Sequence, residues 1–103
     1  MNIEKTVSEL IKISSLSTHE RNIADYIFTS LLVAGLKPIK QSGNVVVQLK
    51  SFNSTKAIIF DAHMDTISPG ALSTWKLPPY GKDAGVSIGG KIYGGRASKY
   101  RVV

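Results

Sequence analysis

The chain contains no cysteine, so it can form neither a disulfide framework nor a thiolate metal site. It also has no hydrophobic run near the roughly 20 residues that a membrane-spanning helix needs. The N-terminus carries Glu4 and Lys5 in an amphipathic pattern, which is unlike the apolar centre of a signal peptide. These absences predict a cytoplasmic protein that does not enter a membrane.

Acidic residues are scarce, with 7 Asp and Glu against 13 Lys and Arg and a formal net charge of +6. Such a balance raises the question of a nucleic-acid partner. The basic residues are scattered, however, and no patch interleaved with aromatic residues accompanies them, which favours a solvated basic surface over nucleic-acid binding. Length and composition, 103 residues with 43% hydrophobic and 19% charged, are typical of one small globular domain with a limited core.

Two amphipathic helices are predicted in the first third of the chain. Residues 3–14 carry apolar side chains at helical spacing, namely Ile3, Val7, Leu10 and Ile11. Ser17 and Glu20 have the spacing of a capping box, which predicts a second helix from about residue 18 to residue 34. Gly35 supplies the stop signal for that helix.

Two hairpins are predicted after the helices. The first joins residues 39–41 to residues 44–49, and the second joins residues 86–88 to residues 91–93 around a pair of glycines. The intervening loop contains Trp75, which could be a substrate platform, although an aromatic residue that anchors an irregular segment is the commoner case.

The segment from Ala57 to Thr66 carries the main functional signal. Its first four residues, 57–60, form an apolar run with the pattern of a strand buried on both faces, and a run this short also fits a buried helical segment. In such a strand the side chains alternate between faces, so Asp61, His63 and Asp65 would point the same way just beyond the apolar part. A His-x-Asp pair suits a metal site, because a carboxylate can fix the imidazole tautomer, but the spacing alone favours a capped strand end with a satisfied histidine.

The wider context of this segment resembles the N-terminal part of the M20 family of metallopeptidases and deacylases. That family includes acetylornithine deacetylase and succinyl-diaminopimelate desuccinylase. The resemblance runs from about Val7 to Ser98 and rests on the segments 60–66, 69–70, 79–81 and 90–94 together with Trp75.

The resemblance implies an α/β fold: the N-terminal part of a zinc-peptidase-like catalytic domain, with two helices, then a hairpin and a buried strand. It implies that His63 binds one metal of a two-zinc centre and that Asp65 orients this histidine as a catalytic residue. The implied substrates are small peptides or N-acyl amino acids, and no substrate-binding residue is predicted.

The end of the chain departs from the family pattern. Lys99 stands where the family has the aspartate that bridges the two metals, and an ammonium group offers no lone pair to a cation. The family's Glu-Glu pair, its later ligands and its lid domain would all follow Val103. We therefore expect residues 1–103 to be a truncated portion of the catalytic domain that does not hydrolyse substrates itself. The alternative is a non-catalytic binding or assembly module that pairs with a full-length relative or forms a homo-oligomer.

Overall fold

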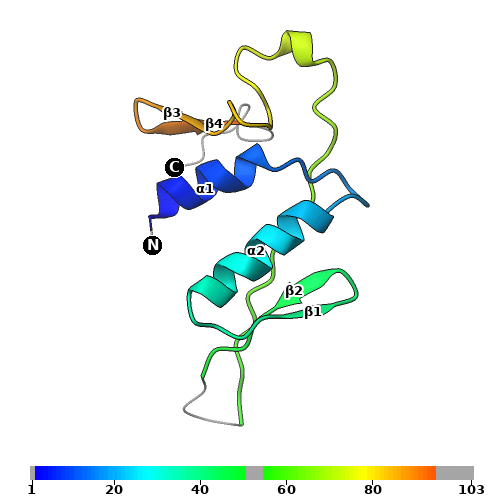
Figure 1. Cartoon of the computed structure of the whole chain (residues 1–103), viewed down its shortest axis with the longest axis vertical. Coiled ribbons are helices and arrows are strands. Elements are labelled where there is room, and N and C mark those ends of the chain that lie inside the picture. Colours follow the sequence, from blue (N-terminus) through cyan, green and yellow to red (C-terminus); the bar gives the residue numbers. More distant parts are fainter. Residues whose placement is uncertain (1, 51–54, 95–103) are drawn as a thin grey trace.

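The computed structural model describes residues 2–50 and 55–94. These residues form a small α/β fold of two helices and two antiparallel hairpins. The elements, in chain order, are α1 (Ile3–Lys12), α2 (Arg21–Val33), β1 (Ile39–Gln41), β2 (Asn44–Val46), the short 3-10 helix η1 (Leu72–Thr74), β3 (Val86–Ile88) and β4 (Lys91–Tyr93). Each helix packs beside one hairpin, α1 against β4 and α2 against β2 (Figure 1).

Helix α1 starts where the sequence predicts. The Asn2 side chain accepts a hydrogen bond from the backbone N–H of Lys5 at 3.0 Å, which satisfies one of the donors at the helix start. On the opposite side of the helix from solvent, the Ser8 hydroxyl donates to the Gly85 carbonyl at 2.6 Å and ties α1 to the second hairpin. In the part of the chain that the structure describes, no helix is long and apolar enough to cross a membrane.

Helix α2 differs from the prediction at its start and agrees with it at its end. The predicted capping box is wrong, because the Ser17 hydroxyl bonds to another segment and the Glu20 carboxylate accepts from the N–H of Thr18 at 2.8 Å. Thr18 has a φ of 71°, so the helix begins only at Arg21. At the other end, Gly35 adopts a φ of 83° and the two hydrogen bonds of a Schellman motif close the helix.

Both predicted hairpins are confirmed, the first with a shorter second strand that ends at Val46. Each has a two-residue turn with positive φ at both positions, Ser42-Gly43 and Gly89-Gly90, and this is the twist that suits the flanking strands. Lys40 on β1 lies 5.2 Å from the centre of the Phe28 ring and forms an ion pair with Asp25, which fastens this hairpin to α2.

The buried core is small. Within residues 2–50 and 55–94, the buried hydrophobic side chains are Ile23, Ala24, Ala84 and Ile92, and the most buried polar one is Ser15, at 2% exposed. The remaining large apolar residues are partly or largely exposed, so burial of apolar surface supplies only modest stability to these residues.

The predicted buried strand at residues 57–60 is wrong. The structure assigns no strand there, and Ile58, Ile59 and Phe60 are 85%, 86% and 94% exposed. A strand buried on both faces needs a paired strand on each side and a layer over each face. The four strands of the described residues pair only within their own hairpins, so no strand among them is paired with this segment.

Candidate metal-ligand site

His63 and Asp65 lie on the irregular segment that follows the exposed apolar run. This segment is held by the linker between α1 and α2 through a short parallel bridge of Leu16 with Thr66. The Thr66 N–H donates to the Ser15 carbonyl at 2.8 Å, and the Ser17 N–H donates to the Thr66 carbonyl at 3.2 Å. The site therefore takes its position from a linker some fifty residues earlier in the chain and not from a sheet.

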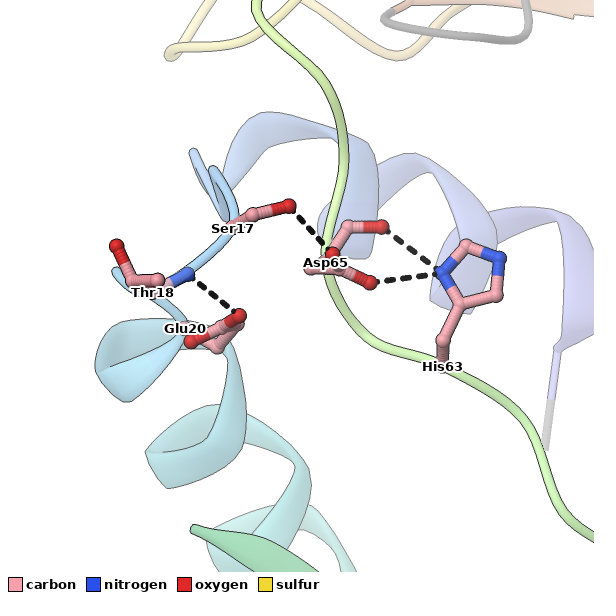
Figure 2. Close-up of polar contacts among 5 residues, drawn as sticks. All are labelled: Ser17, Thr18, Glu20, His63 and Asp65. Carbon is pink, nitrogen blue, oxygen red and sulfur yellow. Dashed lines mark hydrogen bonds and ion pairs between the residues drawn. The ribbon is translucent and has the colours of Figure 1, made fainter.

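The side chains of Ser17, Asp65 and His63 form one continuous polar chain (Figure 2). His63 Nδ1 lies 3.0 Å from Asp65 Oδ1 and 3.0 Å from the Asp65 backbone carbonyl oxygen. The other carboxylate oxygen, Oδ2, accepts a hydrogen bond from the Ser17 hydroxyl at 2.5 Å. The predicted pairing of His63 with Asp65 is present, and the sequence analysis missed Ser17 as its third member.

The electrostatics of the site favour an ionised Asp65. The Ser17 hydroxyl, and after it His63, hold the pKa of the Asp65 carboxyl below its usual value, because both donate hydrogen bonds to the charged form. An ionised carboxylate and a carbonyl oxygen can only accept, so the hydrogen between them and His63 resides on Nδ1. The lone pair of the neutral imidazole then lies on Nε2, on the other side of the ring.

His63 and Asp65 border a shallow depression of about 620 Å³ together with Asp61. All three side chains line this hollow, but Ala62 and Met64 between them line it as well, so the lining does not separate the two sets of side chains as strand alternation would. The turn of the first hairpin, residues 42–44, and Glu20 at the start of α2 form its other walls. Three carboxylates, those of Glu20, Asp61 and Asp65, therefore line this depression in a chain whose net charge is positive.

The residues that the structure describes do not complete a zinc site. No group of three or more His, Cys, Asp or Glu side chains among them is placed to hold a metal ion. A catalytic zinc normally takes three protein ligands. Here His63 supplies the one imidazole of the site, and the Asp65 carboxylate already bonds to Ser17 and His63, so the site falls short of three ligands. Lys99, which the sequence places at the bridging position, lies outside the described residues.

The second histidine of the chain, His19, is exposed. Its Nδ1 lies 3.2 Å from the Thr18 hydroxyl and 3.4 Å from the Ser17 carbonyl oxygen. Neither of these partners is a carboxylate, so within residues 2–50 and 55–94 His19 differs from His63 in the one feature that would prepare an imidazole for a metal. This difference makes His19 a natural internal control.

Trp75 lies beside a larger, mainly apolar groove of about 1120 Å³. Its indole N–H donates to the Pro69 carbonyl at 3.0 Å, and the ring is partly buried, so Trp75 anchors its own loop. The groove runs between α1, this loop and the second hairpin, and is lined among others by Leu10, Leu77 and Tyr93.

Comparisons of the chain with models of known protein families, with curated proteins and with solved structures return no significant match.

Proposed function

We propose that this chain is the N-terminal portion of an M20-like, zinc-dependent amidohydrolase and supplies His63 as a metal ligand, with Asp65 as the residue that orients it. The observation that carries the proposal is the pair of 3.0 Å contacts from His63 Nδ1 to the two Asp65 oxygens. A carboxylate bonded to one ring nitrogen fixes the tautomer and raises the basicity of the other nitrogen, as is usual for metal-bound histidine. The expected cytoplasmic location belongs to this proposal and rests on the sequence pattern.

The 103-residue chain is not expected to hydrolyse amides by itself. Zinc in such enzymes polarises the carbonyl and activates water, and this requires a closed set of ligands with an open position. The described residues provide one histidine toward that set. The chain's own contribution is therefore to hold the hydrogen of His63 on Nδ1, so that Nε2 is the ring nitrogen that would bind a metal shared with ligands from elsewhere.

A zinc titration followed by NMR of the two histidine rings tests this proposal. We expect the His63 ring signals to shift at lower zinc concentration than those of His19, and we expect the response to disappear in His63→Ala. His19→Ala is the matched control and should leave the His63 response unchanged. An equal response from both rings, or a preference for His19, would contradict the metal-ligand assignment.

The same protein is assayed for hydrolysis of N-acetyl amino acids and dipeptides with and without zinc. We expect no turnover above that of a zinc blank. Zinc-dependent turnover that is lost in His63→Ala would show that the chain is a complete catalyst and would overturn the proposed inactivity.

The alternative of a binding or assembly module has its own supporting observation. Ile58, Ile59 and Phe60 form a continuous exposed apolar run, each at least 85% exposed, and such runs are typical of surfaces that a partner covers. Sedimentation at increasing protein concentration tests it, because self-association should be weakened by Ile59→Lys. A monomer at all concentrations, with no change in the variant, would remove self-association as the function of this run.

A further inference from the structure

The geometry points to Ser17 as a positioning residue for His63, acting through Asp65. This inference rests on the proposed function, in which His63 is a metal ligand. Ser17 lies 48 residues from Asp65 in the chain, and its hydroxyl donates to Asp65 Oδ2 at 2.5 Å. Its side chain bonds to Asp65 and not to His63, so its effect on His63 is indirect.

The backbone places Ser17 where this hydrogen bond can form. Leu16 and Thr66 form the parallel bridge, and Ser17 and Asp65 each lie next to a member of that pair. Ser17 begins the turn that follows the bridge, and its side chain meets the Asp65 carboxylate beside the paired residues (Figure 2). The two backbone hydrogen bonds of Thr66, at 2.8 and 3.2 Å, keep the segments in this register. Ser15, 2% exposed, anchors the linker on its other side.

The hydrogen bond from Ser17 determines which oxygen of Asp65 faces the imidazole. With Oδ2 engaged by the hydroxyl, Oδ1 is directed at His63 Nδ1, where it meets the ring at 3.0 Å. The Asp65 side chain is only about one-third exposed, whereas that of His63 is 65% exposed, so the carboxylate is the more buried member of the pair. Removal of the hydroxyl frees the carboxylate to rotate, which weakens one of the two Asp65 contacts that hold the hydrogen on His63 Nδ1.

Direct measurement of the His63 tautomer tests this inference without any metal. Nitrogen-15 NMR of the ring is recorded at a pH well above the range in which histidine titrates. In the unsubstituted chain we expect the hydrogen on Nδ1. In Ser17→Ala and Ser17→Val we expect the Nε2 signal to move toward that of a protonated nitrogen, whereas Ser17→Thr, which keeps the hydroxyl in a shape matched to valine, should retain the original spectrum.

A second readout follows zinc binding at His63 in the same variants. Partners that orient a metal-bound histidine typically change metal affinity by about 10- to 100-fold when removed. We expect Ser17→Val to weaken the zinc response of His63 by about tenfold, at the low end of this range because Ser17 acts through another residue. Ser30→Ala is the control, since the Ser30 hydroxyl donates to the Tyr26 carbonyl within α2 at 2.8 Å and is not part of the site.

The outcomes separate the inference from the function on which it rests. An unchanged tautomer in Ser17→Val, with helix content preserved by circular dichroism, overturns the role of Ser17 even when zinc still selects His63. A changed tautomer with no preference of zinc for His63 confirms the positioning role and overturns the metal-ligand function. Equal tautomer shifts in Ser17→Thr and Ser17→Val also count against the inference, because the hydroxyl is then not the cause.

Discussion

Truncation of one isoleucine in the exposed apolar run and one in the core should have very different effects on stability. Ile59 is 86% exposed and Ile23, on α2, is 7% exposed. In Ile59→Ala the removed carbons face water in the folded and unfolded states alike, so the free energy of unfolding should change by no more than about 0.5 kcal/mol. In Ile23→Ala the loss of buried carbons and the resulting cavity should cost about 2–5 kcal/mol, reduced by a few tenths because alanine favours helix.

Urea unfolding followed by helix circular dichroism and by the fluorescence of Trp75 measures both changes. Ile59→Lys sharpens the comparison, because a lysine is tolerated at an exposed position but is strongly destabilising in a strand buried on both faces. A loss of about 2 kcal/mol or more in Ile59→Ala, or failure of Ile59→Lys to fold, would show that residues 57–60 are buried in solution. The reasoning from exposure would then be refuted, and the buried strand predicted from sequence would be restored.

Three further changes probe the fold and the site. Gly85→Ala should destabilise the chain by about 2–4 kcal/mol, because the φ of Gly85 is 71° and the added carbon would lie 2.5 Å from the Ser8 carbonyl oxygen. Gly89→Ala is the control: Gly89 has a φ of 57° and no atom within 4 Å of the added carbon, so the substitution should cost only about 1–2 kcal/mol in the same urea assay. Asn2→Ala should remove about 1 kcal/mol and reduce the helix signal at the start of α1, and an unchanged thermal midpoint would contradict the capping role. The pKa of Asp65 is lowered in the folded chain, so its carboxylate stabilises the fold at pH values above the ordinary value of 3.8. This contribution should be lost as the pH falls through the folded-state pKa. The urea midpoint of Asp65→Asn should therefore decline less on acidification than that of the unsubstituted chain.

The local elements were predictable because their causes are local. Helical spacing, the glycine at position 35 and the paired turn residues each act over a few neighbouring residues, and the structure contains the helices and hairpins that they indicate. The strand at 57–60 was not predictable in the same way. Its apolar pattern describes a preference for burial, whereas strand formation depends on neighbouring strands that the described residues do not supply.

In the site, the pair of neighbouring residues was predictable from the sequence and the residue that comes from a distant segment was not. His63 and Asp65 are two residues apart, so their pairing is visible as a motif, and the structure places them in contact. Ser17 had a strong local interpretation as a helix cap, because its spacing from Glu20 is that of a capping box. A long-range hydrogen bond to Asp65 displaced the local one, and nothing in the spacing of the two segments signals that contact.

The exposed run and the polar site adjoin in sequence, with only Asp61 and Ala62 between Phe60 and His63. The backbone of the site is held on its C-terminal side, by the hydrogen bonds of Thr66 with the α1–α2 linker. Ile59→Lys should therefore leave the tautomer of His63 unchanged while Ser17→Val alters it, and both spectra come from the same nitrogen-15 experiment. A tautomer that responds to Ile59→Lys would mean that residues 57–60 help to position the imidazole, which requires contacts that their present exposure excludes.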